Sequence, residues 1–173
     1  SATQVKLIGN SPQRLVYQIT LSYLATTEVS TPMGNFTMLS AEGFGQRNIP
    51  GEPALPVYRR LIEFPFDASV KINIIRQHYQ EIDLQASGVT SRIFPAQPPL
   101  SKSDDPEKVP FQFNENAYSQ NRFTEDPFCL VSPVGVMRAL NMARVDISPV
   151  QYNPVENKLR VYDVLEIEIL FEN

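Results

Sequence analysis

The strongest structural signal in the sequence is a period-two alternation near its C-terminal end. Between residues 159 and 172, apolar and charged residues take turns along the chain. The apolar row contains Leu159, Val161, Leu165, Ile167, Ile169 and Phe171, and the charged row contains Arg160, Glu166, Glu168 and Glu172. Such alternation is typical of a β-strand with one buried face. Asp163 interrupts the apolar row, which indicates a β-bulge at that position.

Other stretches repeat this period. In residues 15–23 an apolar row predicts a second strand with a buried face, and Val16 is the exception on its polar side. That row consists of Leu15, Tyr17, Ile19, Leu21 and Tyr23. Residues 70–75 alternate as well, until Ile75 shifts the apolar phase by one position, which predicts a bulge or a bend. Further strands are predicted at residues 35–39, 57–64, 128–131, 136–143 and 142–147.

The fifteen prolines of the chain argue against a largely helical fold. Proline lacks a backbone donor and is excluded from helix interiors and central strands, so its frequency favours short strands joined by loops. No helical pattern alternates with these strands. We therefore predict an all-β fold, an antiparallel two-sheet β-sandwich, and assign residues 1–173 to a single domain.

One long stretch lacks any strand pattern. Residues 94–121 contain Pro95, Pro98, Pro99, Pro106 and Pro110, and we expect them to project from the sandwich as a loop. The central part, QPPLSKSDDPEK from Gln97 to Lys108, carries a single large apolar residue, Leu100. Ordered loops of this length are usually functional. The residues alone leave open whether the stretch is a linker or a loop that a partner binds.

Composition and charge exclude several classes of protein. The net charge of -4 and a pI near 5.0 argue against a nucleic-acid binder, which presents a basic face. We expect neither a membrane span nor a retained signal peptide, because no long apolar run is present. The single histidine, His78, and the single cysteine, Cys129, lie in predicted strands without a catalytic motif around them. We predict that the chain has no catalytic residues, and that Cys129 is a buried structural thiol.

Metal and cofactor sites are not indicated either. One histidine and one cysteine cannot form a transition-metal site of the usual nitrogen and sulfur type. Asp104, Asp105 and Glu107 lack the spaced ligands and the glycine of a calcium loop, so a solvated acidic loop is the simpler interpretation. The spacing of Gly43, Gly45 and Gly51 does not fit a phosphate loop, and we interpret these glycines as turn formers.

Three blocks of sequence carry a resemblance to a known family. They are GEPALPVYRRLIEFP from Gly51, PAQPPLSKSDDPEKVPFQFNENAY from Pro95 and SPVQYNPVENKLRVYDVLEIEI from Ser148. Together they resemble the N-terminal propeptide of the gingipain family of bacterial cysteine peptidases. The resemblance implies a β-sandwich that precedes a peptidase domain, assists its folding and blocks its active site until the propeptide is removed. The partner is then the cognate cysteine peptidase catalytic domain, which supplies the catalytic residues itself.

The resemblance also assigns a role to the proline-rich loop. In gingipain propeptides a basic residue of this region enters the specificity pocket of the enzyme, and the matching position is Lys102. The resemblance then implies that Ser101 and Ser103 line the cleft while Asp104 and Asp105 contact its rim. Arg92 and Lys108 are nearby alternatives for the basic residue. The family also implies a secreted, extracellular or cell-surface protein of Bacteroidetes-type bacteria, connected with virulence.

Two other classes of function compete with this interpretation. A stand-alone β-sandwich module of a bacterial surface protein could bind glycans or proteins through Tyr58, Phe111, Phe113 and Tyr118. The absence of tryptophan weakens the glycan version. A purely structural domain of a larger surface protein is the third possibility.

Overall fold

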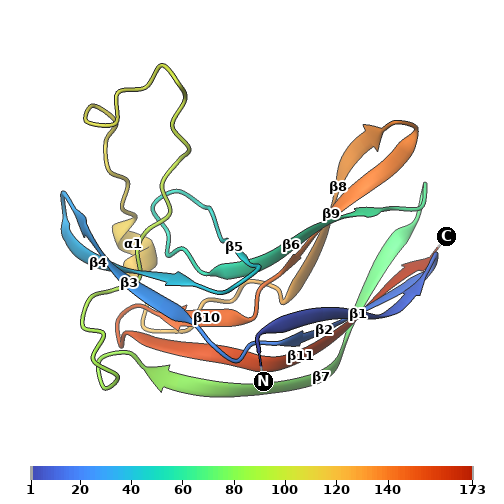
Figure 1. Ribbon diagram of the computed structural model, residues 1–173, viewed down its shortest axis with the longest axis horizontal. Coiled ribbons are helices and arrows are strands. Elements are labelled where there is room, and N and C mark those ends of the chain that lie inside the picture. Colours follow the sequence, from blue (N-terminus) through green and yellow to red (C-terminus); the bar gives the residue numbers. More distant parts are fainter. Residues whose placement is uncertain (1, 173) are drawn as a thin grey trace.

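The computed structural model describes residues 2–172 as three antiparallel sheets and one short helix (Figure 1). The larger sheet contains β1 (Gln4–Ser11), β2 (Arg14–Thr20), β7 (Ser69–Asp83), β10 (Val150–Asn153) and β11 (Lys158–Glu172). The second sheet contains β5 (Gly45–Gln46), β6 (Pro56–Glu63), β8 (Cys129–Met137) and β9 (Leu140–Ile147). A separate hairpin pairs β3 (Ala25–Thr31) with β4 (Gly34–Ser40), and the helix is α1 (Glu115–Tyr118).

Strand β11 organises the larger sheet. Its partner along one edge is β7, and along the other edge β10 pairs with its first residues and β2 with its later ones. The pairing with β7 shifts register between Tyr162 and Val164, so the bulge predicted at Asp163 is confirmed. A second shift leaves Ile75 without a partner on β11, which explains the change of apolar phase in β7. The alternation in the sequence therefore predicted both the strand and its irregularities.

The hydrophobic core lies between the larger sheet and the second sheet. In Figure 1 β7, β11, β2 and β1 run along the lower side, with β6 and β9 above them. The apolar row of β11 is at most 6% exposed at every position, and it shares one core cluster with Val145 and Ile147 of β9. Aromatic contacts also cross between the sheets: Phe64 packs edge-on against Phe171 with ring centroids 5.7 Å apart. The all-β sandwich prediction is confirmed, with the β3–β4 hairpin as an additional small sheet.

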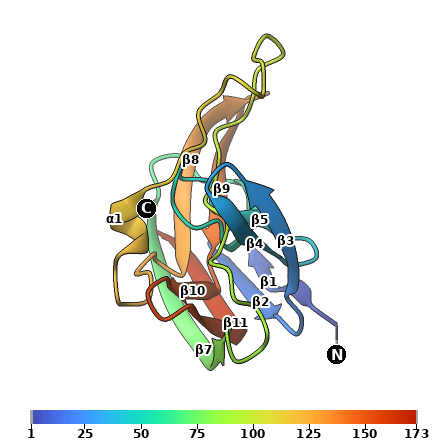
Figure 2. The ribbon, with the colours of Figure 1, turned by 90° about the vertical axis from the view of Figure 1, so that its left-hand side faces the viewer.

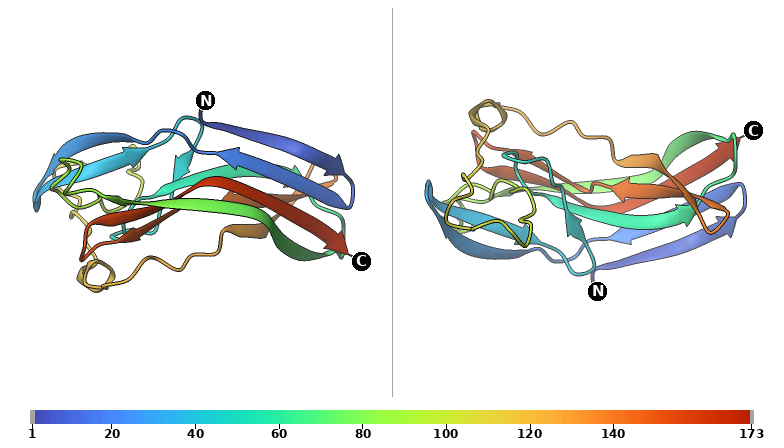
Figure 3. Two further views of the ribbon diagram at one scale, coloured as in Figure 1. Left: turned by 90° about the horizontal axis from the view of Figure 1, so that it is seen from below. Right: turned by 90° about the horizontal axis from the view of Figure 1, so that it is seen from above.

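The ends of the molecule are occupied by different elements. Figure 3 shows the β3–β4 hairpin at one end of the elongated molecule and the last residues of β11 at the other. The segment between β7 and β8 rises from the hairpin end, which separates it from the C-terminal end of β11 (Figures 1 and 2).

Two side chains in residues 15–23 differ in exposure from what the alternation predicts. Tyr23 lies beyond the end of β2 and is 73% exposed, so its assignment to the buried row is wrong. Val16 faces the polar side but is buried, because Gly9 at a bulge of β1 has no side chain there. A Cβ on Gly9 would lie 2.9 Å from Cγ2 of Val16. The glycine thus lets an apolar residue pack on an otherwise polar face.

Tyr17 gives the core a measurable sensitivity to alkaline pH. Its ring centroid lies 6.0 Å from that of Tyr58, and burial raises the pKa of Tyr17 from its ordinary value of 10.0 to about 12. Below pH 10 the phenol is protonated in both the folded and the unfolded chain. Between pH 10 and about 12 only the unfolded chain ionises, so the free energy of unfolding falls as the pH rises through this window.

We predict that Tyr17→Phe reduces this loss by about 2 kcal/mol and has little effect at neutral pH. Among residues 2–172 the Tyr17 hydroxyl forms no hydrogen bond, so phenylalanine keeps the packing and loses no partner. Urea unfolding at a series of pH values measures the difference. Tyr23→Phe is the control, since Tyr23 is 73% exposed. An identical alkaline loss in the Tyr17→Phe variant and the unmodified chain would contradict the prediction.

Candidate functional site

The base of the loop at residues 94–121 is held by backbone pairing with the segment that precedes β6. The amide of Ala54 donates to Phe94 O (2.9 Å), and the amide of Ala96 donates to Glu52 O (2.8 Å). Between them Pro53 and Pro95 form an isolated antiparallel bridge. The two prolines sit where no ladder donor is required, which is how proline is accommodated in a β-pairing. The first limb of the loop is therefore fixed to the sandwich.

Gly51 connects this first limb to the second. Its amide donates to Ala96 O (2.8 Å), and its carbonyl accepts the amide of Asn114 (2.9 Å). The backbone of Gly51 has φ +84°, in the left-handed region that favours glycine. A Cβ at this position would lie 3.0 Å from Asn114 N. One residue without a side chain thus joins both limbs.

Gln97 closes the loop above this base. Its side-chain Nε2 donates to Gln112 O (2.8 Å) and to Pro95 O (3.1 Å), while its Oε1 accepts the amide of Gln112 (2.9 Å). The side-chain amide of Gln97 thus forms two hydrogen bonds with the backbone of Gln112, in the way that a paired backbone would. Beyond this closure, residues 98–110 form the extension seen in Figure 1, whereas Phe111 packs back on Phe36 and Phe94.

An aromatic cluster packs the base from below. Phe36 of β4 lies within 6.5 Å, centroid to centroid, of four rings, which belong to Phe94, Phe111, Phe113 and Tyr118. Tyr118 of α1 is 3% exposed, and its hydroxyl donates to Ile93 O (2.5 Å). Helix α1, which the sequence analysis did not predict, places this ring and is capped by the side chain of Asn114.

The aromatic platform expected from the sequence is therefore wrong. Tyr58 lies apart from the other three rings, because it belongs to β6 and its ring packs against Tyr17 and Phe44. Phe111, Phe113 and Tyr118 fasten the loop to the β3–β4 hairpin instead of presenting a flat surface. Arg92 lies 5.3 Å from the centroids of the Phe113 and Tyr118 rings, so its guanidinium is engaged in the base of the loop.

The five predicted site residues are consecutive on the extension: Ser101 to Asp104 form one turn, and Asp105 begins the next. Ser101, Lys102, Ser103, Asp104 and Asp105 are all exposed. The amide of Asp104 donates to Ser101 O (3.1 Å), which places Lys102 and Ser103 at the two central positions of a β-turn. Among residues 2–172 Lys102 has no carboxylate within ion-pair distance. Its ammonium group therefore points into solvent from a defined backbone.

The residues considered for catalysis or metal binding occupy structural positions. His78 lies on the edge strand β7, and its Nδ1 is 2.7 Å from Oδ1 of Asp163. Cys129 is buried, and burial raises the pKa of its thiol to about 12, which keeps it in the unreactive protonated form. Within residues 2–172 no cluster of three or more histidine, cysteine or acidic side chains is arranged to hold a metal ion.

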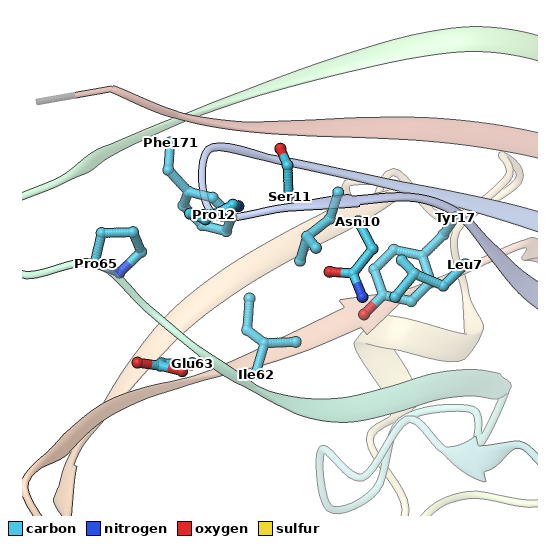
Figure 4. Close-up of a pocket in the computed structure, with 10 residues that line it drawn as sticks. Leu7, Asn10, Ser11, Pro12, Tyr17, Ile62, Glu63, Pro65 and Phe171 are labelled. Atoms are coloured by element: carbon cyan, nitrogen blue, oxygen red, sulfur yellow. The ribbon is translucent and has the colours of Figure 1, made fainter.

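A cavity of about 600 Å³ opens far from the loop, at the C-terminal end of β11 (Figure 4). Its lining is mainly apolar and comes from the facing sheets, with Leu7, Tyr17, Ile62, Pro65 and Phe171 among the residues. Asn10, Ser11, Glu63 and the Tyr17 hydroxyl supply polar atoms. The cavity shares no residue with the loop, so the two features are independent candidates for a binding site.

Comparison with known proteins identifies the family. The Propeptide_C25 family model matches residues 3–173. The chain belongs to this family. Lys-gingipain of Porphyromonas gingivalis is 34% identical over 170 residues, and gingipain R1 of the same organism is 24% identical over 166 residues. These matches include 98% and 95% of this chain but only 10% and 16% of the relatives' length.

Solved structures of propeptides show the same fold. A structure from work on the zymogenic latency of gingipain K from P. gingivalis matches this Propeptide_C25 chain with a TM-score of 0.90. The sequence identity is 33%, and the match covers 99% of this chain and 94% of the other. The complex of the pro- and mature domains of RgpB from P. gingivalis matches with a TM-score of 0.79 at 21% identity, covering 96% and 84%. The second match supports the fold alone. Among residues 2–172 no helix is both long and apolar enough to cross a membrane.

Gly51 is a turn former, as predicted: the amide of Glu52 donates to Ile49 O (3.0 Å), and Gly51 has positive φ in this turn. Its second role in holding the loop, and the roles of Gln97 and Asn114, were not predicted from the sequence. No local pattern in the sequence indicates that Gly51, Gln97 and Asn114 meet. Gly45 is not a turn former, because it lies in β5.

We predict that Gly51→Ala destabilises the fold more than Gly43→Ala does. Both glycines have positive φ, +84° and +79°, so alanine costs about 1–2 kcal/mol of backbone strain at either position. At Gly43 a new Cβ meets nothing within 4 Å, whereas at Gly51 it presses on Asn114. Displacing Asn114 adds about 1 kcal/mol for the weakened hydrogen bond. Equal free energies of unfolding for the two variants in urea titrations would show that Gly51 does not hold the loop.

Proposed function

We propose that this chain is the inhibitory propeptide of a secreted gingipain-like cysteine endopeptidase and keeps it latent by placing Lys102 in its active-site cleft. The observation that supports this most directly is the position of Lys102. It is exposed, has no ion-pair partner among residues 2–172, and lies on an extension whose base is fixed by Gly51 and Gln97. Membership of the Propeptide_C25 family and the resemblance to the gingipain K structure support the propeptide role.

The partner is the catalytic domain of the same precursor. The RgpB structure contains a propeptide bound to its mature domain, which supports an analogous pairing for this chain. Among the basic residues of the region, Lys102 fits the role better than its neighbours. Arg92 is stacked on the Phe113 and Tyr118 rings, and Lys108 closes a second turn by donating its amide to Asp105 O (2.9 Å).

The chemistry of the turn suits insertion into a cleft with an acidic pocket. A lysine ammonium forms its strongest interaction with a carboxylate inside a pocket from which water is excluded, and this interaction gives both affinity and selectivity. Ser101 and Ser103 offer small hydroxyl groups on either side of Lys102 and line the cleft. Asp104 and Asp105 follow and contact its rim, where basic or donor groups of the peptidase meet them.

Two further parts of the proposal come from the family. The propeptide assists the folding of the peptidase domain, because it offers a preformed surface against which that domain assembles. Secretion to the outside of the cell or to its surface follows from the gingipain relationship. The chain itself acts without catalytic residues, so hydrolysis belongs to the partner domain.

We predict that Lys102→Ala, made in the complete precursor, weakens latency. Truncating one partner of a buried charge pair costs about 2–5 kcal/mol, equivalent to about a thirtyfold to several-thousandfold loss of inhibition. The measurement is the ratio of peptidase activity before and after removal of the propeptide. Lys108→Ala is the matched control, because it removes a lysine of the same extension without touching the turn at its tip.

An unchanged latency ratio for Lys102→Ala would refute the assignment of this residue. Equal losses for Lys102→Ala and Lys108→Ala would instead point to the general charge of the extension. The covalent precursor fixes the ratio and the effective concentration of the two domains, so a difference in latency between variants reports on the loop itself.

The alternative, a stand-alone binding module, has one feature in its favour. The cavity near Phe171 is large enough for a small ligand, but its largely apolar lining does not suit a glycan. Binding to a glycan array by the isolated domain, together with a gene that encodes no peptidase after residue 173, would favour the module over the propeptide.

A further inference from the structure

We propose that Asp104 makes the extension an inhibitor instead of a substrate, by holding Lys102 in a closed turn in which the Lys102–Ser103 peptide bond is hydrolysed slowly. This inference rests on the proposed function, in which Lys102 enters the cleft of a lysine-accepting cysteine peptidase. It assigns to Asp104 a positioning role that is separate from the pocket contact of Lys102.

A lysine in the specificity pocket creates a problem for an inhibitor. The peptidase thiolate can add to the Lys102 carbonyl carbon, after which the bond to the Ser103 nitrogen breaks and that nitrogen leaves as an amine with a proton from the peptidase. Water then releases the Lys102 carboxylate from the thioester and restores the thiol. One water is consumed and one peptide bond is lost, so an exposed loop that binds like a substrate should be destroyed.

The turn around Lys102 is closed by three hydrogen bonds. The amide of Asp104 donates to Ser101 O (3.1 Å), and the Oδ2 atom of Asp104 accepts the amide of Ser101 (2.7 Å). The hydroxyl oxygens of Ser101 and Ser103 lie 3.0 Å apart and share a third hydrogen bond across Lys102. Asp104 thus takes part in two of the three, one through its backbone and one through its carboxylate.

A closed turn does not present the geometry that peptide hydrolysis requires. A protein segment recognised by strand addition lies extended along its partner. Three residue steps of extended chain span about 10 Å, whereas the ends of a β-turn are less than about 7 Å apart. The Ser101–Asp104 turn must therefore open by about 3 Å before the Lys102 carbonyl can align with the thiolate. Small misplacements of this kind reduce reaction rates strongly.

The rest of the extension opposes this opening. Its two ends are held by the Gln97 side chain and by Gly51, so the extra length cannot come from the base. Pro98 and Pro99 on one limb, and Pro106 and Pro110 on the other, fix the backbone φ angle and limit how far the limbs can rearrange. Opening of the Ser101–Asp104 turn therefore depends mainly on breaking the hydrogen bond between the Asp104 carboxylate and the Ser101 amide.

Asp105 provides a matched comparison. Its Oδ1 accepts the amide of Glu107 (3.0 Å) and its carbonyl accepts the amide of Lys108 (2.9 Å), so it belongs to the next turn. Asp104 and Asp105 are adjacent, exposed and equally charged. Only Asp104 donates to and accepts from Ser101, which lies on the other side of Lys102.

The test uses the complete precursor and follows cleavage at the Lys102–Ser103 bond by intact mass and by the appearance of a new Ser103 N-terminus. We expect Asp104→Ala to be cleaved about 3- to 10-fold faster than the unmodified precursor, the change that follows from losing one such hydrogen bond. Latency then decays on the same timescale. Glu107→Ala should match the unmodified precursor, because it removes an exposed carboxylate of the same extension that takes no part in the Ser101–Asp104 turn. Asp104→Asn, which keeps an acceptor oxygen, should restore most of the resistance.

A precursor that carries Asp104→Ala and lacks the catalytic cysteine of its peptidase domain should remain intact, because the cleavage is self-inflicted. Equal cleavage rates for Asp104→Ala and the unmodified precursor would overturn the inference, as would equal acceleration by Asp104→Ala and Glu107→Ala. Full latency of Lys102→Ala would instead refute the proposed function. The two failures are therefore distinguishable in one set of variants.

Discussion

The structure depends on the pairing of β11 with strands on both of its edges. Three strands are hydrogen-bonded directly to it, and its apolar row forms the floor of the core. The bulge at Asp163 divides the strand into a part that pairs with β10 and a part that pairs with β2. Because β10 and β2 lie in line along one edge, the same strand supports both the hairpin end and the C-terminal end of the sandwich. The base of the loop packs against the first of these ends.

The sequence predicted this framework well because alternation reports directly on burial. A strand with one buried face must place every second side chain in the core, so β2 and β11 were recognisable from residue type alone. In β7 the alternation marks only the first residues, where Val70 and Ile72 are partly buried against the core. The bulges were recognisable too, since each one breaks the phase, at Asp163 and at Ile75. The prediction was wrong where the phase continues past the end of the pairing, as at Tyr23, since sequence periodicity does not show where a partner strand ends.

The position of the loop in the chain was predicted from the sequence, but its conformation was not. Its prolines exclude regular pairing, which the sequence shows, but its order comes from contacts between residues far apart in the chain. A backbone hydrogen bond joins Gly51 to Asn114, and neither residue type predicts it. The side-chain amide of Gln97 bonds to Gln112, fifteen positions away. Helix α1 is too short to leave a periodic signal and is ordered by its tertiary contacts. Long-range hydrogen bonds of this kind have no local pattern.

The division of the loop into a fixed base and an exposed tip follows from where apolar side chains are available. Below Gln97 the limbs carry Phe94, Phe111 and Phe113, whose burial against Phe36 offsets the entropy lost on ordering. Above Gln97, Leu100 is 51% exposed and packing cannot order the chain. Order there comes from prolines, which restrict the unbound chain, and from the turn closed by Asp104. A loop ordered in this way loses less entropy on binding, so more of the interaction energy of Lys102 appears as affinity. The same hydrogen bonds that prepare the tip for binding also resist the extended conformation, and binding without turnover is what distinguishes an inhibitor from a substrate.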